Sequence, residues 1–378
     1  MKSGNLSDTP LDEAEAAPGV WVVDDPAEVT PEWMTSVLRA GGTDLEVTGL
    51  SYEPIGTGQL GASYRFVLDA RPGPGAEDDA PRTVVLKMAT GPDEVRDLIG
   101  LGYRTEVNFY RLFAPAAQIR VPRCWSADIT ADARQFTLVL QDAHPALPGS
   151  QVEGCTVEQA AAAVRNLAGL HASFWNDDRL TGGGLAWLRR GDERALTNFG
   201  RLLVTATAGF VERFAAMLAP EDADTLRQTA EAMSGWGRRI AGRHSLIHGD
   251  YRLDNLLFAA DDDVTAVDWQ SLEVGFPGRD LAYFLSTALP PALRRTDQKA
   301  LVGAYHEALV EYGVTDYSLD DCFTDYRLGQ PQGPLITILG CMYSASAPTE
   351  RSDQMFLSMA ANACAAIRDL GTLDLLTS

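Results

Sequence analysis

The chain has 378 residues, of which 46% are hydrophobic, and it carries 52 acidic against 31 basic side chains, a formal net charge of −21. This length suffices for two domains or one two-lobed unit with a sizeable core. The negative charge disfavours binding to nucleic acid or to an anionic membrane surface, because both need clustered Lys and Arg.

The five cysteines form no C-x-x-C pair and have no accompanying histidine cluster, so neither a disulfide framework nor a structural zinc site is predicted. The N-terminal segment is polar and acidic, and no stretch approaches about 18 uninterrupted apolar residues. We therefore expect a cytoplasmic protein without a membrane segment. The sequence gives no indication of the oligomeric state.

Residues 1–25 lack hydrophobic periodicity and predict a flexible N-terminal tail. A helix is predicted next, with Thr30 as its N-cap and Pro31 at its first position. Apolar residues fall on one face of this helix, which is expected to pack on the outside of a first lobe.

A glycine-rich motif of the form G-x-G-x-x-G follows. Its glycines, and the serine after them, are Gly56, Gly58, Gly61 and Ser63. A dinucleotide-binding motif should open a helix, yet Tyr64–Leu68 alternate like a strand, and Ala62 stands where a Walker A loop needs lysine. The motif predicts a strand–loop–strand flap whose backbone amides cover nucleotide phosphates. A ligand-free hairpin is the alternative.

A single lysine, Lys87, lies near the end of the apolar strand Thr83–Met88. A lysine in such a strand is costly unless its charge is paired. Glu106, in the helical stretch Tyr103–Phe113, is the expected partner, which leaves the ammonium group to hold nucleotide phosphates. Glu94 is the rival partner, and a solvent-directed Lys87 is the alternative.

The next apolar strand, Phe136–Leu140, ends at a polar segment where the chain can leave the first lobe. Backbone groups around Gln141 and Ala143 are candidates to meet an adenine edge, although an ordinary strand-ending turn explains them equally well. Beyond residue 150 the pattern is mostly helical, beginning with a capping box at Thr156–Gln159. Helical segments are predicted to about 175 and near 193–218, 221–241, 280–289, 297–312, 334–346 and 353–370. The histidine His171 is expected to be a hydrogen-bonded core residue.

A polar loop between two short apolar strands is the centre of the predicted site. It has the spacing H-x-D-x4-N, with Asp250 and Asn255, and the following hairpin leads to Asp268. Phosphoryl transfer needs such a trio, because a carboxylate orients the attacking hydroxyl while an amide oxygen and a second carboxylate hold Mg²⁺. The alternative is a polar hairpin in which Asp and Asn only form turns.

These motifs in this order resemble the aminoglycoside phosphotransferase and choline kinase superfamily over roughly residues 30–375. Leu170–Trp175 and Ala365–Leu370 look like its ecdysteroid-kinase-like branch. The run His248–Asn255 is similar to phosphotransferase domains found with acyl-CoA dehydrogenases, whose substrates are hydroxyacyl-CoAs. Those domains usually have Glu after Asp-Trp, where this chain has Gln270.

The resemblance implies an α+β, protein-kinase-like bilobal fold with a small β-rich N-lobe, residues 26–141, and a larger, mainly helical C-lobe, residues 142–378. It also implies transfer of phosphate from ATP to a small-molecule hydroxyl. The roles that it implies are a catalytic base at Asp250, Mg²⁺ ligands at Asn255 and Asp268, a phosphate-binding lysine at Lys87 and its partner at Glu106. Arg252 either stabilises the transferring phosphate or braces the loop.

A protein acceptor is disfavoured, because only 11 residues separate Asp268 from Asp280 and a peptide platform needs a longer segment. The expected function is therefore an ATP- and Mg²⁺-dependent small-molecule kinase. The alternatives are a hydroxyacyl-CoA-type kinase, a catalytically silent nucleotide-binding protein on the same fold and, below these, a dinucleotide-dependent oxidoreductase. The fold alone does not select the acceptor.

Overall fold

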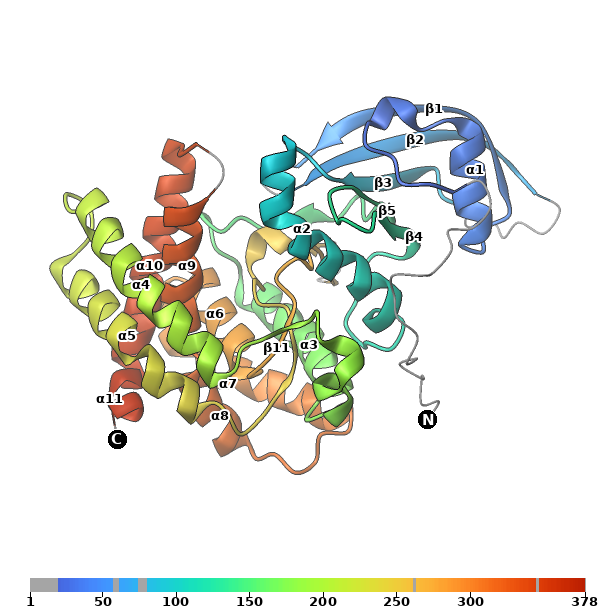
Figure 1. Cartoon of the computed structure of the whole chain (residues 1–378). Helices are drawn as coiled ribbons and strands as arrows, with labels where there is room; N and C mark the ends of the chain where they lie inside the picture. Colours follow the sequence, from blue (N-terminus) through green and yellow to red (C-terminus); the bar gives the residue numbers. More distant parts are fainter. Residues whose placement is uncertain (1–19, 57–60, 74–79, 261–262, 345–346, 378) are drawn as a thin grey trace. The chain divides into compact units, whose positions relative to one another are not determined.

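The computed structural model describes residues 20–56, 61–73, 80–260, 263–344 and 347–377, and the chain divides into two compact units (Figure 1). The first unit takes in residues 1–116, 121–144 and 268–271, and the second takes in 117–120, 145–267 and 272–378. The predicted tail lies mostly outside the described residues. The boundary predicted between residues 141 and 142 stays a prediction.

The first unit is built on one antiparallel sheet. In chain order its elements are α1 (Pro31–Ala40), β1 (Leu45–Ile55), β2 (Ala62–Pro72), β3 (Thr83–Met88), α2 (Asp93–Asn108), β4 (Cys124–Ile129) and β5 (Phe136–Gln141). The strand order is β1-β2-β3-β5-β4. As predicted, Thr30 caps α1 and Pro31 opens it, and the buried face of α1 joins apolar side chains of the strands in one core.

The helix predicted over Tyr103–Phe113 begins ten residues earlier, at Asp93, and its last turn is a π-helix, Phe109–Phe113. Gly100 and Gly102 weaken the helical signal before Tyr103. Gly100 lies at a close approach, since a Cβ there would be 3.0 Å from the Ala133 carbonyl oxygen, whereas a Cβ on Gly102 would make an ordinary contact with Gln270 Cβ at 3.4 Å. Tertiary packing therefore overrides their low helix propensity.

The second unit is mainly helical. In chain order its elements are β6 (Leu147–Pro148), α3 (Val157–Ser173), β7 (Arg189–Arg190), α4 (Glu193–Arg213), α5 (Pro220–Arg239), β8 (Ser245–Ile247), β9 (Leu256–Phe258), β10 (Val264–Ala266), β11 (Glu273–Gly275), α6 (Gly278–Ala288), α7 (Pro291–Glu311), α8 (Leu319–Leu328), α9 (Gln332–Tyr343), α10 (Glu350–Asp369) and α11 (Thr372–Thr377). The sequence does not predict α8 or α11, although Ser318, which caps α8, is a start signal for it.

Two three-stranded sheets frame the polar loop of the second unit. β8 leads into the loop and pairs with β11, while β9 and β10 leave it as the predicted antiparallel hairpin. The capping box at Thr156–Gln159 is present at the start of α3. The pairing of β8 with β11 and of β9 with β10 therefore fixes both ends of the loop.

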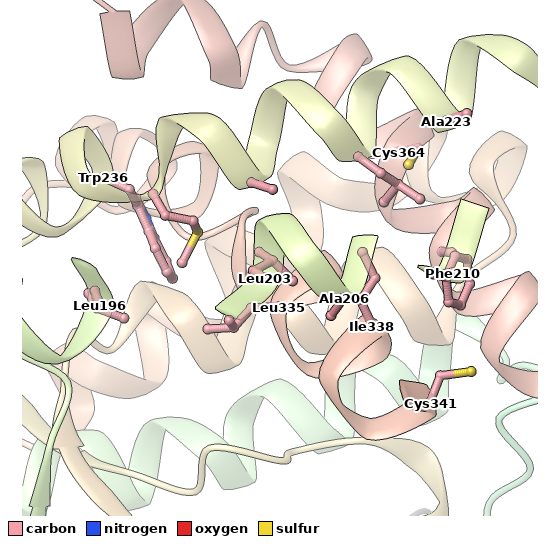
Figure 2. Packing of buried hydrophobic residues seen from close by; sticks show 14 of the residues in the cluster. Leu196, Leu203, Ala206, Phe210, Ala223, Trp236, Leu335, Ile338, Cys341 and Cys364 are labelled. Carbon is pink, nitrogen blue, oxygen red and sulfur yellow. The ribbon is translucent and has the colours of Figure 1, made fainter. Parts of the chain in front are cut away.

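The helices α4, α5, α9 and α10 enclose a core of buried apolar side chains (Figure 2). Trp236 of α5 lies in this core and donates its indole N–H to the Leu328 carbonyl at 2.6 Å. Such an acceptor is needed when a tryptophan is fully buried, because its indole N–H would otherwise lack a partner. Within the described part of the chain, no helix is long and apolar enough to cross a membrane.

Gly329→Ala is expected to destabilise the second unit, because its Cβ would lie 1.9 Å from the Gly278 carbonyl oxygen. Overpacking of this kind costs roughly 1–3 kcal/mol, measured as the free energy of unfolding in urea. Gly303→Ala in α7 is the control, since that site is open, and it should stabilise by about 0.5–1 kcal/mol. Equal effects of the two substitutions would contradict the packing seen at Gly329.

Candidate active site

Lys87 lies at the centre of a charged cluster in the first unit. Its Nζ is 2.7 Å from Glu106 Oε2 and 3.0 Å from Asp268 Oδ1. The pairing with Glu106 that the sequence predicts is present, and Glu106 is buried. Burial lowers the pKa of Lys87, but the charges of Asp268 and Glu106 outweigh this effect and raise the pKa overall. The ammonium group therefore stays protonated at neutral pH.

The cluster has one positive and two negative side chains, a formal charge of −1. Burial is the main cause that raises the pKa of Glu106, and Lys87 opposes it. The Asp268 side chain is 43% exposed and has a left-handed backbone with φ of 66°, which Asp tolerates better than most residues. An exposed carboxylate beside a buried pair is suited to bind a cation.

The glycine motif lies between β1 and β2, in the strand–loop–strand arrangement that the sequence predicts. Gly56 has a positive φ of 72°, and Ser63 pairs with Lys87 across the β2–β3 ladder. A Cβ on Gly61 would lie 3.1 Å from the Met88 carbonyl oxygen, a tight contact that favours glycine there. Gly58 lies outside the described residues.

The segment after β5 is held by an ion pair in which Arg65 Nε donates to Asp142 Oδ2 at 2.7 Å. Gln141 ends the strand, and its Oε1 accepts from the Arg123 backbone N–H at 3.3 Å. Ala143 follows Asp142 and is partly buried. The roles predicted for Gln141 and Ala143 at an adenine edge stay predictions.

In the second unit, Asp250 and Asn255 lie together. The Asn255 Nδ2 donates to the Asp250 carbonyl at 2.9 Å and to its Oδ2 at 3.0 Å. Asp250 Oδ1 accepts from the Tyr283 hydroxyl at 2.9 Å. Arg252 pairs with Asp250 Oδ2 at 3.3 Å and also with Asp254. The Asp250 carboxylate is thus fixed from three sides and remains 25% exposed.

A buried carboxylate holds the backbone before Asp250. Asp280, near the start of α6, accepts from the backbone N–H groups of His248 at 2.6 Å and Gly249 at 3.0 Å. Its Oδ2 also lies 3.4 Å from His171 Nε2, and the His171 Nδ1 is 2.6 Å from the Tyr305 hydroxyl. His171 is therefore the hydrogen-bonded core histidine that the sequence predicts.

Two buried glutamines complete the support of the loop. Gln332 Nε2 donates to the Gly249 carbonyl at 3.1 Å, while Gln332 Oε1 accepts from Arg279 Nε at 2.8 Å. Gln151 Oε1 accepts from the Leu253 N–H at 3.1 Å. Gly249 has a φ of 79°, a left-handed backbone that glycine adopts without strain.

The sequence does not predict the supporting roles of Asp280, Tyr283, Gln332 and Gln151. Asp280 and Tyr283 carry a partial signal, because they flank and interrupt the apolar run of this helix. The glutamines carry none, since their contacts join residues more than 50 positions apart in the sequence.

No group of three or more His, Cys, Asp or Glu that could hold a metal is found among the described residues. Mg²⁺ does not need such a group, because it is usually bound through one or two carboxylates, with phosphate oxygens and water filling its other positions. Asn255 and Asp268 supply the oxygen donors that Mg²⁺ prefers. Their residue types therefore fit the predicted metal.

The model of the ecdysteroid kinase-like family matches residues 194–315, about a third of the chain. This segment contains Asp250, Asn255, Asp268 and Asp280. No curated protein sequence matches the chain.

Among solved structures, an ethanolamine kinase from Plasmodium vivax is similar, with 11% identity and a TM-score of 0.52 over 85% of this chain and 83% of that one. A protein from Ralstonia eutropha described as a candidate aminoglycoside phosphotransferase has 17% identity and a TM-score of 0.49, covering 87% and 97%. An aminoglycoside phosphotransferase from Alicyclobacillus acidocaldarius has 13% identity and a TM-score of 0.45, over 93% of this chain and 97% of that one.

The likeness to the ethanolamine kinase confirms the predicted fold class, an α+β protein-kinase-like fold with a β-rich part and a mainly helical part. The chain therefore resembles the aminoglycoside phosphotransferase and choline kinase superfamily in its fold as well as in its motifs.

Asp280→Asn should lower the free energy of unfolding near pH 7 by roughly 2–4 kcal/mol, because the variant loses a charge that accepts backbone hydrogen bonds. Burial raises the pKa of Asp280, but hydrogen bonding and charge from His171 and the His248 contacts lower it overall. A lowered pKa gives stability that is full above the ordinary value of about 3.9 and is lost at lower pH.

The difference between wild type and Asp280→Asn should therefore narrow below about pH 4. Urea unfolding at a series of pH values measures it. A difference that stays constant down to pH 3 would show that Asp280 is not held ionised in the fold.

Proposed function

We propose that this protein transfers the terminal phosphoryl group of ATP to a hydroxyl group of a small molecule. The observation that carries the proposal is the charged cluster of Lys87, Glu106 and Asp268 on the first unit. It occurs in a chain whose second unit presents a fixed Asp250 beside Asn255. These are the residue types that phosphoryl transfer requires for holding phosphates, metal and nucleophile.

In this proposal, residues 26–141 bind the nucleotide and residues 142–378 provide the catalytic loop and bind the acceptor. Lys87 contacts the phosphates of ATP, and Glu106 holds the ammonium group in place. The flap with Gly56, Gly58, Gly61 and Ser63 covers the phosphates with backbone N–H groups. Gln141 and Ala143 meet the adenine edge.

Asn255 and Asp268 are the proposed Mg²⁺ ligands. When bound, Mg²⁺ neutralises charge on the phosphate oxygens. The Asn255 amide nitrogen donates to Asp250, which fixes the orientation of the amide and leaves its oxygen as the ligand atom.

Asp250 is the proposed base. The acceptor oxygen forms a bond to the γ-phosphorus, its proton passes to an Asp250 carboxylate oxygen, and the bond to the β–γ bridging oxygen breaks to release ADP. The hydrogen bond from Tyr283 and the contact with Arg252 set the direction of the carboxylate. Arg252 carries a raised pKa, because the charge of Asp250 outweighs the effect of burial, so it remains a cation that can brace the loop or meet the transferring phosphate.

A small acceptor is supported by the short segment from Asp268 to Asp280, which leaves no length for a peptide platform. An ethanolamine kinase shares the fold, and the family model that matches residues 194–315 is named for kinases that resemble those of ecdysteroids. Amino alcohols and sterol-like alcohols therefore belong in the first panel of acceptors. Aminoglycosides, sugars and hydroxyacyl thioesters complete it.

Asp250→Ala should reduce turnover by roughly 10²–10⁴-fold, the usual contribution of a positioned acid or base, while Mg-ATP still binds. The measurement is ADP release with Mg-ATP across the acceptor panel, with wild type and variant in parallel. A hit that disappears in the variant identifies both reaction and acceptor class. Equal turnover by the variant contradicts the role of Asp250, and wild-type nucleotide binding without any turnover favours a binding protein.

Asp268→Ala should abolish the Mg²⁺-dependent part of nucleotide binding, because the variant lacks an exposed carboxylate ligand. Calorimetric titration with ATP, with and without Mg²⁺, measures this part directly. Asp263→Ala is the control, since Asp263 is an acidic residue near the same hairpin whose carboxylate pairs with Arg120. Mg²⁺ dependence that survives in Asp268→Ala would exclude Asp268 as a ligand.

A further inference from the structure

Three consecutive residues, Asp268, Trp269 and Gln270, each contact the Lys87–Glu106 pair. Asp268 Oδ1 accepts from Lys87 Nζ at 3.0 Å. The Trp269 backbone N–H donates to Glu106 Oε1 at 3.4 Å, and Gln270 Nε2 donates to Glu106 Oε2 at 3.2 Å. The Glu106 carboxylate therefore receives a donor on each oxygen in addition to the ammonium group.

The Gln270 side chain has little freedom to leave this position. It is 5% exposed, and it lies against α2 at Gly102, where a Cβ would be 3.4 Å from Gln270 Cβ and 3.6 Å from its Oε1. The preceding residue, Trp269, stacks its ring on that of Phe109, with a distance of 3.6 Å between the ring centroids and an angle of 8° between the ring planes. The backbone of the segment is thus anchored beside Glu106.

A neutral donor at this position avoids repulsion between Gln270 and the Glu106 carboxylate. A carboxylate in place of the Gln270 amide would put two carboxylates about as close as the present 3.2 Å contact, and like charges at that distance in a buried site cannot both stay ionised without cost. The amide instead stabilises the ionised Glu106 and leaves it available to Lys87.

We propose that Gln270 is a positioning residue for nucleotide binding, which acts by holding the Glu106 carboxylate toward the Lys87 ammonium group. This inference rests on the proposed function, because it assigns Lys87 to the phosphates of ATP. It adds a residue that the motif of glycine flap, lysine and glutamate does not contain.

The test measures the dissociation constant of Mg-ATP by calorimetric titration of the full chain, together with the thermal unfolding temperature. Gln270→Met keeps the length of the side chain and removes the donor, and it should weaken binding roughly ten- to hundredfold, the scale of one hydrogen bond to a charged group. Gln270→Glu should weaken it further, and it provides a second variant if the first does not fold. Gln330→Met is the control, because Gln330 is a buried glutamine whose Nε2 donates to the Tyr326 carbonyl, and it should leave the affinity unchanged.

A double-mutant cycle separates positioning from general stability. In a Glu106→Ala background, Gln270→Met should cause little further loss of Mg-ATP affinity, because the group through which it acts is gone. Wild-type affinity in Gln270→Met and Gln270→Glu, or equal losses in both backgrounds, would overturn the inference while leaving the proposed function intact. A wild-type protein that does not bind Mg-ATP would overturn both.

Discussion

A charged side chain that is removed from water has to be met by opposite charge or by hydrogen-bond donors, and this constraint governs the candidate site in both units. In the first unit the cost falls on Lys87 and Glu106. The attraction between the two charges offsets part of this cost of burial, and the hydrogen bonds donated by Trp269 and Gln270 to Glu106 offset a further part. The position of α2 relative to β3 is consequently tied to the segment that carries Asp268.

The second unit meets the same constraint with a different solution. Asp280 is fully buried, and it is met mainly by the backbone N–H groups of His248 and Gly249. Asp280 needs these donors, and by accepting their hydrogen bonds it also fixes the loop to which His248 and Gly249 belong. Gln332 donates to the Gly249 carbonyl, which belongs to the next peptide unit along the chain. The backbone immediately before Asp250 is therefore held by two buried side chains, Asp280 and Gln332.

The sequence predicts those parts of the fold in which the signal is local. The Thr30 cap, the Thr156 capping box and the β9–β10 hairpin follow from neighbouring residues, and so does the strand after the glycine motif. The Lys87–Glu106 pair is predictable because a lone lysine in an apolar strand requires an acid. Gln270, Gln332 and Gln151 are different, since a neutral amide demands no partner that a sequence pattern can reveal. The sequence does not predict the early start of α2 for a related reason, because Gly100 and Gly102 pack against residues that are distant in the sequence, Ala133 and Gln270.

Exposure separates the carboxylates into two groups. Glu106 and Asp280 have side chains that are 1% and 0% exposed, whereas those of Asp250 and Asp268 are 25% and 43% exposed. Here the two buried carboxylates are engaged by partners within the fold, while the two partly exposed ones keep surface at which a proton, a metal or a hydroxyl could be met. The same distinction explains why the sequence does not identify the acceptor of the proposed reaction. In the proposed function the acceptor would be recognised by exposed side chains of the second unit, and for exposed side chains no burial constraint ties residue type to one partner.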